Sequence, residues 1–258
     1  RLDKAREIVD WIFDNLVRED GLLDDGIRMR MSGPEVVDKV YTYNQGTVLG
    51  ASLEIALALR EDVGLDHDEP IDSFEYSERA DASMFYITHI RAIVQAVALH
   101  MANSQGVLLS PPEESGEGDG GLFKGILARY LAEVAERLPE DSKENIATKK
   151  IAARLVMQSA ESLWSHRLEV DGLPVFAAEW TQDAKLPHNY GLGPSSISEA
   201  VGLVRIDERD LSVQLSGWML LEAAASEARS ASSSCFWWRR VVASCSASSP
   251  ATSLTGPC

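Results

Sequence analysis

The stretch FKGILARYLAEVAERL, residues 123–138, decides the fold class of this chain. Its apolar residues recur three and four positions apart, at Phe123, Ile126, Leu127, Tyr130, Leu131, Val134, Ala135 and Leu138. That spacing is typical of an amphipathic α-helix, which packs its apolar face against other elements. Residues 2–18 have the same pattern, with charged side chains on the opposite face. The chain is therefore expected to be built mainly from helices.

On either side of this stretch, the same reasoning predicts further helices at about 45–60, 72–103, 143–166 and 208–227. Runs that alternate apolar and polar residues, which indicate strands, are nearly absent. We therefore predict an all-α fold.

The predicted helices are of two kinds. Residues 47–57 and 213–225 are apolar on nearly every side, whereas residues 2–18 and 143–166 carry charges along one side. Helices that are apolar all round are enclosed by other helices. Outer and inner helices should therefore alternate along the chain.

The connections repeat with the helices. A glycine followed by apolar residues comes after each outer helix, and these segments are 21–23, 106–109 and 172–175. The repeat unit is thus a helical hairpin of roughly 80 residues, which cannot bury its apolar face alone and must stack or close into a ring. Three such hairpins make about half of a ring.

The composition excludes several classes of protein. Hydrophobic residues make up 45% and charged residues 25% of the 258 residues, which is ordinary for a globular domain. The formal net charge of −16 argues against partners that favour basic surfaces, namely nucleic acid and anionic membranes. No apolar run approaches the roughly 18 residues of a membrane span. The charge does not exclude a neutral ligand such as a sugar, because binding one needs no net charge.

Residues 1–228 and 229–258 differ in character. The second segment holds nine Ser, three Arg and no acidic residue, so we expect a disordered tail after a single domain. All three cysteines lie in this tail, and the five His are scattered, so neither a metal nor a cofactor is expected. The chain starts at Arg1 without an apolar leader, and we expect it to begin within a domain.

Candidate functional residues follow from the ring. The N-termini of inner helices meet at one end of such a ring, where unpaired N–H groups and helix dipoles converge. The polar and aromatic residues at these starts are Thr42, Tyr43, Asn44, Gln45, Phe123, Lys124, Asp210, Ser212 and Gln214. Amides, an aromatic ring and an ammonium group suit a ligand with many hydroxyls and a broad apolar ring face. The sequence therefore predicts a cup that binds a sugar.

Structural roles are open for the same residues. Asp210 and Ser212 are suited to capping the last helix, and Tyr43 to a place in the core. Asn44 and Gln45 are suited to satisfying backbone groups near a helix start.

Two acidic segments have competing interpretations as well. Asp24-Asp25-Gly26 fits either a turn or a carboxylate pair for acid–base chemistry at a glycosidic bond. The acids of the Gly/Pro-rich segment before Phe123 are expected to be solvated, and they are Glu113, Glu114, Glu117 and Asp119.

Three segments together resemble glycoside hydrolase family 76. They are YTYNQG at 41–46, preceded by GLLDDG at 21–26, then FKGILARYL at 123–131, and DLSVQLS at 210–216. They occur in the family's order, and the resemblance covers about residues 1–228. It implies an (α/α)6 barrel of the six-hairpin glycosidase type, of which this chain supplies an incomplete ring of about three hairpins.

The resemblance also implies a function. Members are retaining, carboxylate-based endo-α-1,6-mannanases, found outside the cell or in the cell wall, and the substrate is an α-mannan-like polysaccharide or oligosaccharide. We expect a monomer whose sugar cleft is lined by Asp25, Tyr43, Asn44, Gln45, Phe123, Lys124 and Gln214.

The catalytic residues are expected elsewhere. The family's acids are an adjacent Asp pair flanked by Trp in an early inner helix, which corresponds to a position before Arg1. Asp24-Asp25 matches a later Asp-Gly loop, in which only Asp25 fits the family pattern. This chain alone is therefore expected to be poorly active or inactive. The alternatives are a non-catalytic carbohydrate-binding or wall-associated remnant, and another (α/α) barrel sugar enzyme.

Overall fold

The computed structural model describes residues 1–61, 73–112, 114, 118–185 and 210–230. Its α-helices in these ranges are α1 (Leu2–Leu16), α2 (Thr42–Glu61), α3 (Ser73–His100), α4 (Phe123–Arg137), α5 (Lys143–Ser165) and α7 (Leu211–Ser230). A short 3-10 helix, η1 (Gly118–Leu122), leads into α4. The mainly helical fold predicted from the sequence is confirmed, and each predicted helix has a counterpart.

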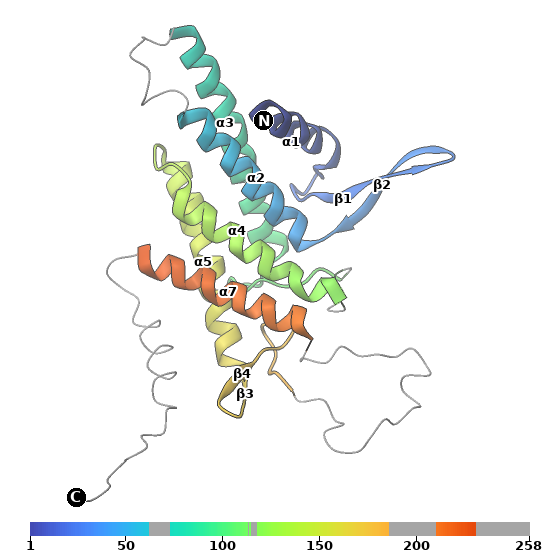
Figure 1. Ribbon diagram of the computed structural model, residues 1–258, viewed down its shortest axis with the longest axis vertical. Helices are drawn as coiled ribbons and strands as arrows, with labels where there is room; N and C mark the ends of the chain where they lie inside the picture. The colour runs from blue at the N-terminus through green and yellow to red at the C-terminus, as the bar shows by residue number, and fades with distance from the viewer. Residues whose placement is uncertain (62–72, 113, 115–117, 186–209, 231–258) are drawn as a thin grey trace, which may run out of the picture.

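The helices form two layers. Figure 1 shows α2, α4 and α7 side by side, with α3 and α5 behind them. Each of these inner helices packs against the next one, and α3 and α5 pack against the inner layer and against each other. Since α1 packs against α2, the order along the chain is outer, inner, three times over. The chain thus forms an incomplete (α/α)6 ring.

The inner helices touch at backbone level. A Cβ added to Gly46 of α2 would lie 2.8 Å from the Cα of Leu127 in α4. A Cβ added to Gly125 of α4 would lie 2.7 Å from the Cα of Ser216 in α7. Any side chain at these two glycines would push the helices apart, so glycine is required for this close packing.

One hydrophobic core lies between the two layers. Its fully buried members include Leu49 and Leu53 of α2, Ile87 and Ile90 of α3, and Leu127 and Leu131 of α4. These positions recur with the helical period in the sequence, which is why the periodicity located the elements correctly.

Both ends of the half ring expose apolar side chains. On α7, Leu211 is 78% exposed and Trp218 is 56% exposed, and on α1 Trp11 is 49% exposed. Within the described residues, no further hairpin packs against either end.

Two segments between helices form β-hairpins that the sequence analysis did not predict. One pairs β1 (Asp24–Arg30) with β2 (Gly33–Val40), and the other pairs β3 (Leu168–Val170) with β4 (Leu173–Val175). The first ribbon extends away from the helices (Figure 1). Ile27 pairs with Val36 and Arg28 with Glu35, and no residue of either strand is buried. The two strands therefore need no regular apolar–polar alternation of the kind that marks a strand packed on a core.

The Ser77–His100 part of α3 is long and apolar enough to cross a membrane by length and composition, although the core helix of a soluble protein passes the same test. The expected tail lies outside the described residues, except for Arg229 and Ser230, which end α7.

Candidate functional site

The starts of the inner helices converge at one end of the half ring. In Figure 1, the N-terminal ends of α2, α4 and α7 lie next to one another on the same side of the molecule. The sequence-predicted residues Asn44, Lys124 and Gln214 all belong to the first turns of these helices. The fold therefore brings together three segments that are far apart in the chain.

Three aromatic rings lie at this end. The ring centroids of Tyr43 and Phe123 are 4.4 Å apart, and those of Tyr41 and Phe123 are 5.7 Å apart in an edge-on arrangement. The rings of Tyr41 and Tyr43 are stacked at 6.0 Å. All three side chains are half-buried, so part of each ring surface remains accessible. Rings of this kind offer the apolar surface on which a sugar ring can pack.

Asp25 is held beside these rings. Its Oδ1 accepts a hydrogen bond of 3.0 Å from the Tyr43 hydroxyl and one of 3.1 Å from Nδ2 of Asn44. The carboxylate is exposed, and Oδ2 has no hydrogen bond within the described part of the chain. Burial and the bond to Asp25 raise the pKa of Tyr43 to about 12, so its hydroxyl remains a donor at neutral pH. The site thus presents a fixed acceptor to a hydroxyl group.

Asp24 has a different set of partners. It accepts from Nη1 of Arg18 at 2.7 Å, and the same guanidinium bonds Asp38 of β2. Arg18 follows α1, so this cluster ties the base of the β1–β2 hairpin to the helical body. Asp24 and Asp25 therefore serve separate networks rather than one acid–base pair.

Gln45 holds the segment that precedes the hairpin. Its Oε1 accepts from the backbone N–H of Leu23 at 2.9 Å, and its Nε2 donates to the carbonyls of Leu23 and Tyr41 at 3.0 and 3.1 Å. The side chain is fully buried.

Gln214 makes the corresponding pair of backbone hydrogen bonds in the third helical hairpin. Its Oε1 accepts from the N–H of Phe176 at 3.0 Å, and its Nε2 donates to the carbonyl of Phe176 at 2.8 Å. Next to it, Asp210 caps α7 by accepting from the backbone N–H and the hydroxyl of Ser212 at 2.9 and 2.8 Å.

Lys124 lies beneath the surface. It is 3% exposed, and its Nζ donates to the carbonyl of Ala178 at 2.8 Å and to Oε2 of Glu179 at 3.3 Å. The ammonium also lies 4.9 Å from the centroid of the Trp180 ring. Burial lowers the pKa of Lys124, while the neighbouring Glu179 and Glu114 oppose that shift.

Sequence reasoning missed the role of Glu114. We expected a solvated acid, but Glu114 is buried and accepts from the backbone N–H of Thr42 at 2.9 Å. The Thr42 hydroxyl donates to the same carboxylate at 2.8 Å. Burial raises the pKa of Glu114. The two residues are 72 positions apart, and no local pattern in the sequence marks this pair.

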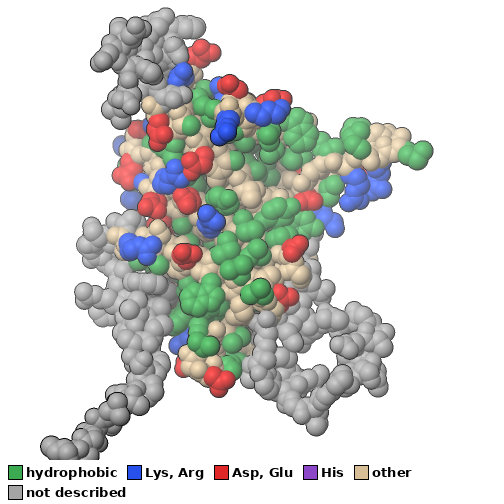
Figure 2. All heavy atoms as spheres, in the orientation of Figure 1, with side chains coloured by type: hydrophobic (Ala, Val, Ile, Leu, Met, Phe, Trp, Pro, Cys, Tyr) green, Lys and Arg blue, Asp and Glu red, His purple; other side chains and the backbone are tan. Residues whose placement is uncertain are grey.

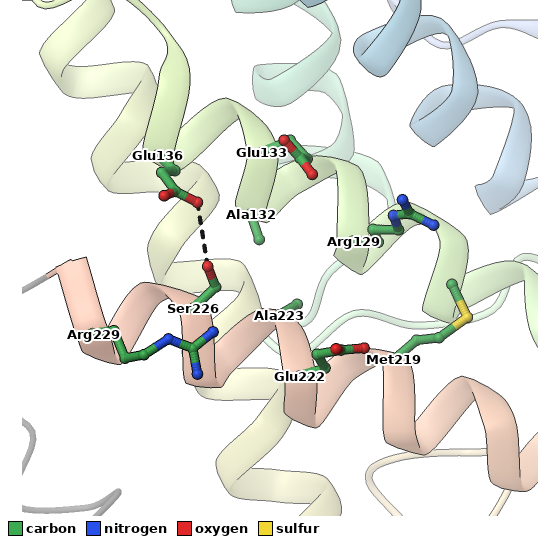
Figure 3. A pocket seen from close by; sticks show the side chains of 9 residues that line it. All are labelled: Arg129, Ala132, Glu133, Glu136, Met219, Glu222, Ala223, Ser226 and Arg229. Atoms are coloured by element: carbon green, nitrogen blue, oxygen red, sulfur yellow. Dashed lines mark hydrogen bonds between the residues drawn. The ribbon is translucent and has the colours of Figure 1, made fainter.

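Among the described residues, no group of three or more His, Cys, Asp or Glu side chains is placed to hold a metal ion. A groove of about 420 Å³ lies between α4 and α7, away from the helix starts (Figure 3). Its lining includes Arg129, Glu133 and Glu136 of α4, and Glu222 and Arg229 of α7.

Residues 2–197 match the profile of glycosyl hydrolase family 76, which is more than half of the chain. The chain belongs to glycosyl hydrolase family 76. The resemblance seen in the sequence motifs is thereby confirmed. No curated protein matches the chain.

Solved structures of family 76 enzymes have the same fold. The GH76A α-1,6-mannanase of a Salegentibacter species is 27% identical, with a TM-score of 0.59 over 88% of this chain and 52% of that one. An inactive variant of that enzyme, with two adjacent aspartates changed to alanine, is in complex with α-1,6-mannotetraose and is 26% identical, with a TM-score of 0.59 over the same shares. A Listeria innocua protein, 23% identical with a TM-score of 0.55 over 88% of this chain and 49% of that one, shares the fold. The chain thus spans about half the length of the family 76 structures that it matches.

Proposed function

We propose that the inner-helix starts of this chain bind α-1,6-linked mannooligosaccharides, as part of a retaining α-mannan hydrolase. The observation that carries this proposal is the exposed Asp25 carboxylate, which Tyr43 and Asn44 fix beside the rings of Tyr43 and Phe123. A fixed acceptor next to an aromatic surface is suited to a hydroxyl on the edge of a pyranose whose face packs on the ring. The α-1,6-mannotetraose bound by a family 76 enzyme supports the choice of sugar.

Within the cup, we assign the predicted residues two kinds of role. Asp25, Tyr43, Asn44 and Phe123 contact the sugar directly, because their side chains are exposed or half-buried at the helix starts. Lys124, Gln45 and Gln214 act through the segments that they hold, because they are hydrogen-bonded to backbone carbonyls there.

We further propose that the chemistry needs two carboxylates that residues 1–258 do not supply. The separate partners of Asp24 and Asp25 support this, as does the loss of activity in a relative that lacks two adjacent aspartates. The retaining mechanism requires a nucleophile and an acid/base carboxyl about 5 Å apart. The alternative is a carbohydrate-binding protein without hydrolytic activity. It is favoured by the same observation, namely that Asp24 and Asp25 have separate hydrogen-bond partners. A location outside the cell and a monomeric state remain predictions.

Calorimetric titration of residues 1–258 with α-1,6-mannotetraose tests the binding proposal, with maltotetraose as the control sugar. We expect the protein to bind α-1,6-mannotetraose and not to bind maltotetraose. Asp25→Ala should weaken it about tenfold, as expected for loss of a charge-assisted hydrogen bond. Equal affinity for both sugars, or an unchanged affinity in Asp25→Ala, would contradict the proposal.

A reducing-end assay on α-1,6-mannan tests the catalytic part. We expect no hydrolysis by residues 1–258, and hydrolysis once a segment carrying an adjacent Asp pair is joined before Arg1. Hydrolysis by residues 1–258 that is lost in Asp25→Ala would instead assign catalysis to that residue.

A further inference from the structure

Two opposite charges are buried directly behind the proposed sugar surface. Lys124 follows Phe123 in the chain, and Glu114 binds Thr42, which lies between Tyr41 and Tyr43. Both charged side chains are less than a tenth exposed. Neither belongs to the hydrophobic core, which lies between the two helix layers.

Glu114 determines how the chain enters α2. Both of its carboxylate oxygens accept from Thr42, at 2.8 and 3.0 Å from the hydroxyl and 2.9 Å from the backbone N–H. This N–H is one of the donors that a helix start leaves without an intrahelical partner. In most helices such a donor is satisfied by a residue just before the helix. Here the acceptor comes from the second hairpin, so the first turn of α2 is fixed relative to that hairpin.

Lys124 connects the second hairpin to the third in the same way. Its bonds to Ala178 and Glu179 join the first turn of α4 to the segment that follows β4. The position against the Trp180 ring fixes the ammonium group from another side. The first turns of α2 and α4 are thus each bonded to the hairpin that follows, α2 through Glu114 and α4 through its own Lys124.

A buried charge is costly to a protein unless its partners are well placed. Neutral residues of similar volume often give equal or greater stability at such positions. The presence of Glu114 and Lys124 at buried positions therefore points to a geometric role, and the neighbouring elements are the turn that carries Tyr43 and the helix start that carries Phe123.

We propose that Glu114 and Lys124 are positioning residues, which together set the distance and tilt between the Tyr43 and Phe123 rings on which the sugar packs. Glu114 does so by holding the Tyr41–Tyr43 turn, and Lys124 by holding the start of α4 against the third hairpin. This inference rests on the proposed function for its consequence in binding, but the ring geometry can be measured without any sugar.

The first measurement is ligand-free. In protein with labelled Tyr and Phe rings, the Tyr43–Phe123 nuclear Overhauser effect should be strong in the wild type, as expected for centroids 4.4 Å apart. It should weaken in the near-isosteric variants Glu114→Gln and Lys124→Met. Glu54→Gln is the matched control, because Glu54 lies on α2, accepts from Arg137 and is exposed. An unchanged signal in folded Glu114→Gln and Lys124→Met would overturn the proposal.

The second measurement is the affinity for α-1,6-mannotetraose. We expect a loss of about tenfold in Glu114→Gln and in Lys124→Met at unchanged helix content, and less than twofold in Glu54→Gln. A wild-type protein that does not bind the sugar contradicts the proposed function, while the ring signal still decides the positioning role. Wild-type affinity in both folded variants would show that their charges do not set the sugar surface.

Discussion

Asp25 and Glu114 lie in two acidic segments that look alike in sequence, because each contains glycine and lies between an outer helix and the inner helix that follows it. In the structure they differ in burial and in how far away in the sequence their partners lie. Asp25 is exposed and bonded to side chains 18 and 19 positions away, while Glu114 is buried and bonded to Thr42, 72 positions away. An acid that faces solvent is free to meet a ligand, whereas one that is enclosed holds the protein in shape. The exposed acid has its partners nearby in the sequence, whereas the buried acid has its partner in a distant segment.

The largest expected effect tests the buried acid. In Glu114→Ala, the Thr42 N–H and hydroxyl lose their acceptor inside the protein, and Lys124 loses a neighbouring negative charge. We expect the free energy of unfolding to fall by about 3 kcal/mol, measured by urea denaturation. Asp25→Ala should change it by less than about 0.5 kcal/mol, as is usual for an exposed group. Similar losses in both variants would remove the distinction between the two acids.

A somewhat smaller effect is expected for the buried amide next to the exposed acid. Gln45→Ala removes three hydrogen bonds to the backbone of Leu23 and Tyr41. We expect a loss of about 2 kcal/mol of unfolding free energy. Faster amide exchange at Leu23 would accompany it. Asn44→Ala, on the same turn but half-buried, is the comparison, and an equal loss there would contradict the separate roles.

The pH dependence of stability extends the comparison to two other acids. Glu227 is buried beside Glu136, and burial raises its pKa to about 7. A carboxyl with a raised pKa in the folded state favours folding below its unfolded pKa of about 4.5, and that contribution is lost as the pH rises towards 7. As the pH increases from 4 to 8, the free energy of unfolding of Glu227→Gln should therefore rise by about 1–2 kcal/mol relative to that of the wild type, measured by denaturation at each pH.

The smallest effect, with the opposite sign, is expected for an exposed acid. A hydrogen bond from Arg137 lowers the pKa of Glu54, so its contribution is present above the unfolded pKa and is lost as the pH falls. Glu54→Gln should lower the midpoint of thermal unfolding slightly at pH 7 and leave it unchanged at low pH. If the stability of Glu54→Gln and that of Glu227→Gln, each relative to wild type, change in the same direction with pH, burial does not decide the direction of the pKa shift.

The sequence was sufficient to predict the helices and the place where they converge. The apolar positions of α4, from Phe123 to Val134, repeat with the helical period, and that signal is local. The motif at 41–46 and the start of α4 were correctly expected to be near each other because ring topology brings inner-helix starts together.

The roles of individual side chains were not predictable in the same way. Gln45, Gln214 and Glu114 are defined by bonds to residues 22, 38 and 72 positions away, which depend on how the hairpins pack. Lys124 was expected to line the sugar cleft because it lies at an inner-helix start, but its side chain is buried and is bonded to Ala178 and Glu179 of the third hairpin. The β1–β2 ribbon was missed because none of its residues is buried, so its sequence lacks the regular apolar–polar alternation of a strand that packs on a core.

The glycine contacts between the inner helices have a mechanical consequence. The backbone of α4 touches α2 at Gly46, and it touches α7 at Gly125. If α4 rotated about its axis, its side chains would therefore collide with the backbones of both neighbours. We therefore expect the three inner helices to behave as one rigid unit in which none slides or turns against its neighbours.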